Sequence, residues 1–266
     1  MVRVAVAQFA PGQDKAENQR SVAELAGRAA ADGADVVLCP EYAMFTAPRT
    51  DHRYVEAAEP LDGPFVSAAA ETARKEGVHL VVGVNEAAGP THFTNTLVAL
   101  SPEGGRIAHY RKIHLYDAFG VRESDVVAPG PIEEPETFTV DGVVFGLQTC
   151  YDLRFPEVTR RIADAGAHVV LLAAQWVPGP LKEDHWRTLA RARAVENTVY
   201  VAAAGQAAPS GAGNSMVIDP MGTPVAALGE QAFAVAGAGV SAARVEEVRV
   251  TNPSLSMRRF GVVPRT

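Results

Sequence analysis

Apolar runs rich in β-branched residues alternate with helical segments along this chain, and the alternation limits the folds open to it. In the first half, the predicted order is strand 2–9, helix 15–32, strand 35–39, helix 62–77 and strand 78–84. A glycine follows each of the two helices, as is typical of helix ends. Strands that alternate with helices usually form a mainly parallel sheet that the helices cover. The first half therefore predicts an α/β layer.

The second half repeats this alternation, and hairpins accompany it. A hairpin is predicted over 93–110, around Pro102-Glu103-Gly104-Gly105, and two strands are predicted over 136–148, around Asp141-Gly142. Hairpins pair antiparallel, so we expect mixed sheets. The remaining predicted elements are helix 156–165, strand 168–173, helix 182–196, strands 198–204, 214–218, 223–228 and 231–240, and a short helix at 241–248.

The composition is that of a globular chain that buries its own core, with 47% apolar and 21% charged residues among 266. We find no linker and expect one domain over 1–266. The net charge of −7 argues against nucleic-acid or anionic-membrane partners. Two cysteines cannot form a disulfide framework, and the first residues lack a signal-peptide pattern, so we expect a cytoplasmic protein. Cysteines and histidines show no zinc spacing and no apolar run is long enough to span a bilayer. We therefore expect no metal, cofactor or membrane anchor.

Three chemically useful side chains stand at or just past the ends of separate predicted strands: Glu41, Lys112 and Cys150. Lys112 also opens an irregular segment, 113–135, that is longer than most connections and therefore indicates a functional loop. Cys150 lies between a strand and a helix that begins near Pro156, and free backbone N–H groups at such a turn can stabilise a thiolate. Ligands of open α/β sheets bind beyond the carboxyl ends of strands, so one sheet edge can bring the three side chains together.

These residues are the parts of a cysteine hydrolase. Cys150 would be the nucleophile, Glu41 the base that takes its proton, and Lys112 a donor to the oxyanion. The backbone N–H of Tyr151 would be the second oxyanion donor. Each side chain also has an ordinary interpretation, as a core cysteine, a solvated loop acid and a surface lysine. Spacing alone leaves both interpretations open.

Ordered motifs along the chain resemble the nitrilase, or carbon–nitrogen hydrolase, superfamily. The resemblance runs from Arg3 to about residue 250 and leaves 251–266 as a C-terminal tail. The motifs are Leu38-Cys39-Pro40-Glu41-Tyr42, Tyr110-Arg111-Lys112-Ile113-His114-Leu115-Tyr116-Asp117, Cys150-Tyr151-Asp152-Leu153-Arg154-Phe155-Pro156-Glu157, His185-Trp186 with Arg191-Ala192-Arg193-Ala194-Val195-Glu196-Asn197, and Gly213-Asn214-Ser215-Met216-Val217-Ile218-Asp219-Pro220-Met221-Gly222.

This resemblance implies an α/β fold of a particular kind, a four-layer α-β-β-α sandwich with two mixed sheets. It implies Glu41 as general base, Lys112 as oxyanion stabiliser and Cys150 as nucleophile. Many members carry a second glutamate in the loop after the lysine, and Glu123 fits that place, where it would position the substrate amide or the water. Members commonly pair through helices, so a homodimer or larger homo-oligomer is implied.

The nucleophile motif looks like that of the Nit-type ω-amidases, which hydrolyse the terminal amide of small dicarboxylate monoamides or of deaminated glutathione. Nitrilases typically have Cys-Trp-Glu where this chain has Cys150-Tyr151-Asp152. N-carbamoylases usually have an extended segment after the lysine motif. The resemblance therefore implies a small-molecule amide substrate, cleaved through a thioester, rather than a nitrile or an N-carbamoyl amino acid. Residues 42–53 and 117–121 depart from the ω-amidase pattern, which leaves the acyl group open.

Four further residues are candidates for the substrate pocket. Arg154 is a candidate carboxylate clamp, because a guanidinium pairs bidentately with a carboxylate. A structural ion pair with a nearby acid such as Asp152 is the alternative. Tyr42, Phe119 and Trp176 are expected to form apolar walls, with packing in the core as their alternative.

Two other classes of function stay open. A papain-like cysteine hydrolase would use His114, His168 or His185 as its base, but the residues around Cys150 lack a Cys-Gly-Ser-Cys-Trp type of motif. A non-catalytic binding or scaffold protein is the second class, because a fold does not determine a function. The intact set of Glu41, Lys112 and Cys150 argues against it.

Overall fold

Two six-stranded sheets face each other at the centre of the molecule. The structure is a computed structural model and describes residues 1–265. The strands of the first sheet lie in the order β12 (Ala234–Val240), β1 (Val2–Gln8), β2 (Val36–Leu38), β3 (His79–Ala87), β4 (Phe93–Leu100) and β5 (Arg106–Arg111). Those of the second lie in the order β11 (Pro224–Ala227), β10 (Met216–Ile218), β9 (Tyr200–Gly205), β8 (Val169–Ala174), β7 (Val143–Thr149) and β6 (Thr137–Val140).

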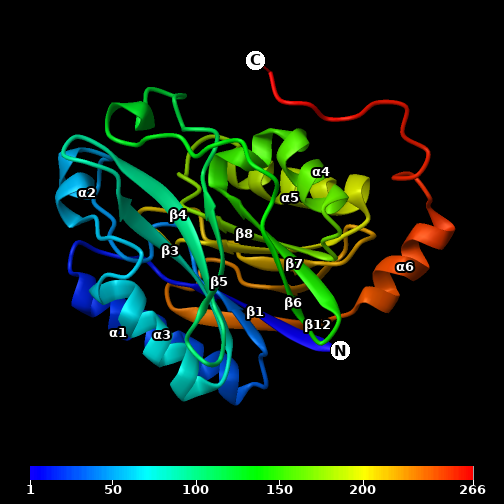
Figure 1. Ribbon diagram of the computed structural model, residues 1–266, viewed down its shortest axis with the longest axis horizontal. Coiled ribbons are helices and arrows are strands. Elements are labelled where there is room, and N and C mark those ends of the chain that lie inside the picture. Colours follow the sequence, from blue (N-terminus) through cyan, green and yellow to red (C-terminus); the bar gives the residue numbers. More distant parts are fainter. Residues whose placement is uncertain (266) are drawn as a thin grey trace.

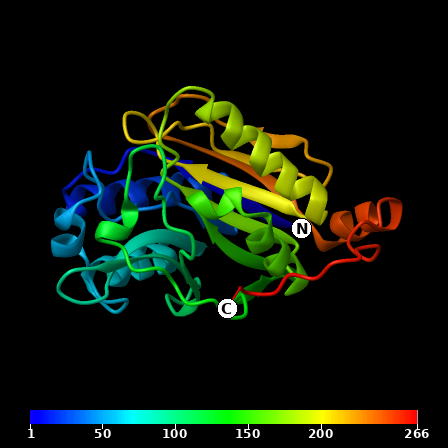
Figure 2. The same cartoon turned by 90° about the horizontal axis from the view of Figure 1, so that it is seen from above.

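Helices cover the outer face of each sheet (Figures 1 and 2). Helices α1 (Lys15–Ala31) and α3 (Pro64–Glu76) lie against the first sheet, and α4 (Pro156–Asp164) and α5 (Lys182–Asn197) lie against the second. Each sheet is mixed, since β1, β2 and β3 are parallel, as are β7, β8 and β9, while their neighbours pair antiparallel. The expected four-layer α-β-β-α sandwich is confirmed.

The central strands are buried on both faces, which explains why they read as continuous apolar runs. Successive side chains of a strand point to opposite faces of its sheet. On β1, Val4 and Val6 therefore face the second sheet, while Ala5 and Ala7 face the helices. Strand β8 shows the same division between the core that lies between the sheets and the core under α4 and α5.

The structure differs from the sequence prediction mainly in short elements. Helix α2 (His52–Ala57) and the 3-10 turn η1 (Glu123–Asp125) were not predicted, because so few residues show no period; α2 is capped by the side chain of Asp51. Helix α6 (Ala242–Thr251) extends further than predicted and includes the first residue of the expected tail. The last tail residue, 266, lies outside the described residues. Within the described part of the chain, no helix has the length and apolar character needed to cross a membrane.

The carboxyl ends of several strands meet at one edge of the sandwich. Strand β5 is antiparallel to β4, which is antiparallel to β3, so β5 ends at the same edge as β2 and β3. In the second sheet, the parallel strands β7 and β8 also end together. The segments that follow these strands therefore build one site from both sheets.

Candidate active site

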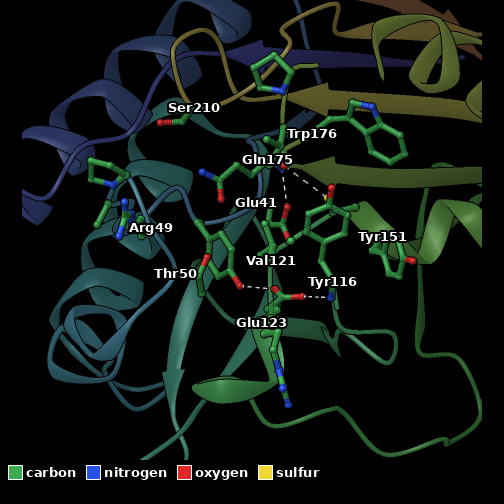
Figure 3. A pocket seen from close by; sticks show the side chains of 18 of the residues that line it. Glu41, Arg49, Thr50, Tyr116, Val121, Glu123, Tyr151, Gln175, Trp176 and Ser210 are labelled. Atoms are coloured by element: carbon green, nitrogen blue, oxygen red, sulfur yellow. Dashed lines mark hydrogen bonds between the residues drawn. The ribbon is translucent and has the colours of Figure 1, made fainter. Parts of the chain in front are cut away.

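Glu41, Lys112 and Cys150, called the trio below, come together at this common edge. Lys112 directly follows β5, Cys150 directly follows β7, and Glu41 comes three residues after β2. The Lys112 Nζ lies 3.1 Å from Glu41 Oε1. The backbone N–H of Gln175, which follows β8, donates to Glu41 Oε2 at 2.5 Å, and the carbonyl of Gln175 accepts from the Cys150 Sγ at 3.7 Å (Figure 3). Both sheets thus hold the carboxylate, the ammonium and the thiol in one place.

Glu41 is fixed by contacts on every side. The Asn95 amide donates to its Oε1 at 2.6 Å, and the Gln206 amide donates to its backbone carbonyl at 2.8 Å. The turn after β2 also packs closely against β3. A Cβ added to Gly83 of β3 would lie 2.6 Å from the carbonyl oxygen of Pro40. Only glycine allows this approach. The carboxylate is therefore buried and pre-positioned, as a general base requires.

Cys150 is the first residue of the 3-10 turn η2 (Cys150–Arg154) and has a φ of 39°. This left-handed conformation is costly for a residue with a side chain, and such conformations cluster at functional sites. Burial raises the pKa of the Cys150 thiol well above its usual value, and the Glu41 carboxylate raises it further, against the opposing effect of Lys112. The cysteine therefore rests as a protonated thiol and needs a base to become a nucleophile.

Lys112 is a buried ammonium between two carboxylates. Its Nζ donates to Glu123 at 2.9 and 2.8 Å, in addition to its contact with Glu41. Burial by itself lowers the pKa of Lys112, but the charges of Glu123 and Glu41 outweigh it and raise that pKa well above the usual value. The lysine therefore remains charged, as a donor to an oxyanion must be.

Glu123, in η1, is the second glutamate that the family resemblance implied. The hydroxyl of Tyr42 donates to its Oε1 at 2.6 Å, and the backbone N–H of Tyr116 donates to its Oε2 at 2.5 Å. Figure 3 shows Glu123 and Glu41 in the same pocket. The buried carboxylate holds Lys112 in position and joins the loop after β5 to the site.

Asp152 ties the lysine loop to the cysteine turn. Its fully buried carboxylate accepts hydrogen bonds from the Tyr110 hydroxyl at 2.7 Å, the His114 backbone N–H at 3.0 Å and the His114 Nδ1 at 2.8 Å. The His114 ring also stacks on Phe155, with 3.7 Å between the ring centroids. Asp152 therefore braces the two segments that carry Lys112 and Cys150.

The three histidines of the papain-like alternative are engaged elsewhere. His114 is held by Asp152. The Nδ1 of His168 accepts from the backbone N–H of Val144 at the start of β7, which is the opposite end of the strand from Cys150. His185 lies beside the guanidinium of Arg154. The titratable side chain that acts most strongly on the thiol is the carboxylate of Glu41, not a histidine.

A cavity of about 790 Å³ opens above the trio. Tyr151, Trp176 and Arg154 are among the residues that line it, and Arg154 lies with its Cζ 4.9 Å from the centre of the Trp176 ring. Tyr42 also borders it, but its ring packs against Tyr54 and Phe93 in the core, so its hydroxyl matters more than its apolar face.

Phe119 is not among the residues that line this cavity, but its ring lies beside two that do, with its centre 6.1 Å from that of Tyr116 and 4.4 Å from the Lys182 Nζ. The loop turns at Phe119 and Gly120, both with positive φ, and 69% of the Phe119 side chain is exposed at the mouth. The turn therefore leaves one side of the ring in solvent and the other beside Lys182 and Arg154.

Several residues of the site were not singled out from sequence. Asn95, Gln175, Tyr116 and Lys182 contact the trio or line the cavity. A signal existed for Asn95, which lies between Thr94 and Thr96 in a polar stretch at the start of β4, and all three residues are buried. In the described part of the chain, no group of three or more His, Cys, Asp or Glu side chains is arranged to hold a metal ion.

A family model described as carbon-nitrogen hydrolase matches residues 3–250. A protein of Escherichia coli O157:H7 named deaminated glutathione amidase is 37% identical over 257 residues, which cover 97% of each chain.

Two solved structures share the fold. The NitFhit protein of C. elegans superposes with a TM-score of 0.87 at 29% identity; the match covers 97% of this chain but only 65% of that longer one. A variant of the amidase from Nesterenkonia sp. AN1 superposes with a TM-score of 0.82 at 27% identity, covering 97% of this chain and 94% of that one. In that structure the acetamide moiety of fluoroacetamide is covalently added at the active-site cysteine.

Proposed function

The chain belongs to the carbon–nitrogen hydrolase family, and we propose that it hydrolyses a small amide to a carboxylic acid and ammonia through a cysteine thioester. The observation that carries this proposal is the buried cluster of Glu41, Lys112 and Cys150 at the floor of a cavity large enough for a small molecule. Residues of both sheets contribute to this cluster, so we propose that 1–266 acts as one catalytic domain.

The first step makes the thioester. Glu41 takes the proton of the Cys150 thiol, and the sulfur attacks the amide carbon, so that a C–S bond forms and the carbonyl oxygen becomes an oxyanion. The Lys112 ammonium and the backbone N–H of Tyr151 stabilise this oxyanion. Glu41 then gives the proton to the nitrogen as the C–N bond breaks, and ammonia leaves. The raised pKa of Cys150 and the proximity of Glu41 support this assignment of base and acid.

The second step releases the acid. Glu41 takes a proton from a water molecule, which attacks the thioester carbon. The C–S bond then breaks, and the proton returns to the sulfur. Glu123 keeps Lys112 charged and in place throughout, since it contacts the Nζ with both oxygens. Tyr42 and Tyr116 also donate to Glu123, so its acceptor sites are filled and it acts on the substrate through Lys112.

For the substrate, we propose an amide that carries a carboxylate away from the scissile bond. The relatives named deaminated glutathione amidase support this class. Arg154 supports it too, because its guanidinium lines the cavity and lies over Trp176, whereas the Asp152 carboxylate is occupied by Tyr110 and His114. N-carbamoyl amino acids and nitriles are the alternative substrates within the family.

An ammonia-release screen tests the function. It covers ω-amides, aliphatic amides, N-carbamoyl amino acids and nitriles. We expect the purified protein to prefer ω-amides and the Cys150→Ala variant to be inactive. Cys39→Ala is the matched control, because burial raises the pKa of that thiol to about 12 and makes it inert. Turnover by Cys150→Ala refutes the mechanism, and silence of the wild-type protein on every substrate favours the scaffold alternative.

We also propose that the chain is a cytoplasmic homodimer. The two described cysteines are free thiols, which suits a reducing compartment. Helices α4 and α5 form an outer layer on which a second copy can pack, and Val195 of α5 has a side chain that is 45% exposed. Light scattering coupled to size exclusion tests the dimer, and a monomeric mass at micromolar concentration rejects it.

A further inference from the structure

Lys182 is a buried cation without a carboxylate partner. Within residues 1–265, three lysine or arginine residues are buried: Lys112, Lys182 and Arg193. Lys112 contacts two glutamates, and Arg193 contacts Glu196 at 2.9 Å. The Lys182 Nζ instead donates to the neutral hydroxyl of Tyr116 at 2.8 Å. A buried ammonium without a counter-ion is costly, so its retention in a cavity wall needs a reason.

The backbone places Lys182 inside against the hydrophobic preference. Leu181, just before it, has a φ of 59° and is 71% exposed, while Lys182 is only 7% exposed. An apolar side chain thus lies in water and a charged one lies inside, which is the reverse of the usual arrangement. The turn at the start of α5 therefore directs the ammonium into the cavity, where Lys182 is a lining residue.

A second cation lies close to Lys182. The Nε of Arg154 is buried and has no hydrogen-bond partner among the described residues. Aromatic rings surround the pair: the Lys182 Nζ lies 4.4 Å from the centre of the Phe119 ring and 5.5 Å from that of Trp176. Burial lowers the pKa of Lys182, and the charge of Arg154 lowers it further. Two positive charges thus share one wall of the cavity, and an anion between them would relieve their repulsion.

We propose that Lys182 is a specificity-determining residue: together with Arg154, it binds a carboxylate on the acyl part of the substrate. The acyl part stays on the Cys150 sulfur, and Arg154 belongs to the same short turn, η2, as this cysteine. The departing amine needs Glu41, which contacts Lys112 and is not part of that turn. The ammonium of Lys182 exchanges its bond to Tyr116 for a charge-assisted bond to the carboxylate. This inference rests on the proposed amidase function.

The test compares two amides that differ in one charge, glutaramate and its neutral methyl ester. The readout is the kcat/KM for glutaramate divided by the kcat/KM for its methyl ester. A charge-assisted hydrogen bond accounts for about 10- to 100-fold in affinity. We expect Lys182→Met to lower this ratio by about that factor, mainly through the KM for glutaramate, and Lys182→Arg to restore part of it. Lys75→Met is the control for surface charge, because that side chain is 81% exposed, and it should leave the ratio unchanged.

Tyr116→Phe separates this role from a structural one. If Lys182 only fastens the loop that carries Tyr116, removal of the hydroxyl lowers the ratio as Lys182→Met does, and the proposal is overturned. An equal loss on both amides in Lys182→Met overturns it as well. If the ammonium binds the carboxylate, Tyr116→Phe keeps the preference for glutaramate.

Binding of the product acid tests the subsite without turnover. Calorimetry measures glutarate binding to Cys150→Ala and to the double variant Cys150→Ala/Lys182→Met. We expect at least about tenfold weaker binding to the double variant. Equal affinities, or binding to neither protein, overturn the subsite. Failure of the amidase function would instead appear as a wild-type protein that binds glutarate but hydrolyses neither amide.

Discussion

Replacement of Glu123 by glutamine tests whether the second carboxylate positions Lys112, the proposed oxyanion donor. Glutamine keeps the size of the side chain but removes its charge and turns one acceptor into a donor. In the structure both Glu123 oxygens accept from the Lys112 Nζ, at 2.9 and 2.8 Å, and one also accepts from the Tyr116 N–H at 2.5 Å. One of these donors would therefore meet the amide NH₂ in the variant.

The expected loss of activity depends on the partner that Lys112 contacts in the variant. Without Glu123, its strongest partner is Glu41, already 3.1 Å away. A tighter pair of Lys112 and Glu41 takes the donor from the oxyanion and the base from the Cys150 thiol. Loss of one preorganised oxyanion donor costs about 2.7–4 kcal/mol, which is about 10²- to 10³-fold in kcat. We therefore expect Glu123→Gln to lose about this much in kcat, with KM changed by less than about threefold because the substrate pocket is intact.

Steady-state ammonia release measures this loss, and Tyr42→Phe is the matched control. That change removes only the 2.6 Å hydrogen bond to Glu123 and leaves its charge. We expect it to cost about tenfold, as for one hydrogen bond to a charged group. Glu123→Gln with more than a third of wild-type kcat would refute the reasoning, and so would a Tyr42→Phe variant slower than Glu123→Gln.

Three further predictions concern the charges around the cysteine and its brace. Lys112→Met should lower kcat by about 10²- to 10³-fold, because the oxyanion loses its cationic donor; a normal kcat in steady-state assays would place the donor elsewhere. Glu41 raises the pKa of Cys150, so Glu41→Gln should lower this pKa and shift the pH midpoint of Cys150 alkylation by iodoacetamide downward, even as turnover is lost. A midpoint that stays or rises, followed by mass spectrometry, contradicts this. Asp152→Ala removes the charged acceptor of three partly buried hydrogen bonds, at about 1.5–3 kcal/mol each. Urea unfolding should show a loss of at least about 3 kcal/mol, and a loss below about 1 kcal/mol would show that Asp152 is no brace.

The layers of the fold were predictable because the central strands are buried on both faces. Burial on both sides requires apolar side chains at every position, and this requirement is visible in a run such as 169–174 without any knowledge of its neighbours. Helix α2 was not predictable in this way, since six residues are too few to show a period. Its Asp51 cap becomes evident only in three dimensions.

Some residues of the candidate site were likewise predictable from local sequence, and others were not. Glu41, Lys112 and Cys150 became candidates because each follows a predicted strand, and parallel strands bring their carboxyl ends to one edge. Their roles were predicted from the resemblance of their motifs to the carbon–nitrogen hydrolase superfamily, since spacing alone left other interpretations open. The position of the Phe119 ring could not be predicted, because it depends on the backbone turn at 119–120, which a residue type does not reveal.

By itself, the sequence determined the α/β layers and which side chains stand at the strand ends, because strand periodicity and local motifs are properties of neighbouring residues. Only the tertiary structure decided how those side chains act. It placed Glu123 against Lys112, braced the cysteine turn through Asp152, and turned Lys182 into the cavity without an acid beside it. Charge, burial and pKa depend on distances between segments far apart in the chain, and those distances exist only once both sheets have closed around the site.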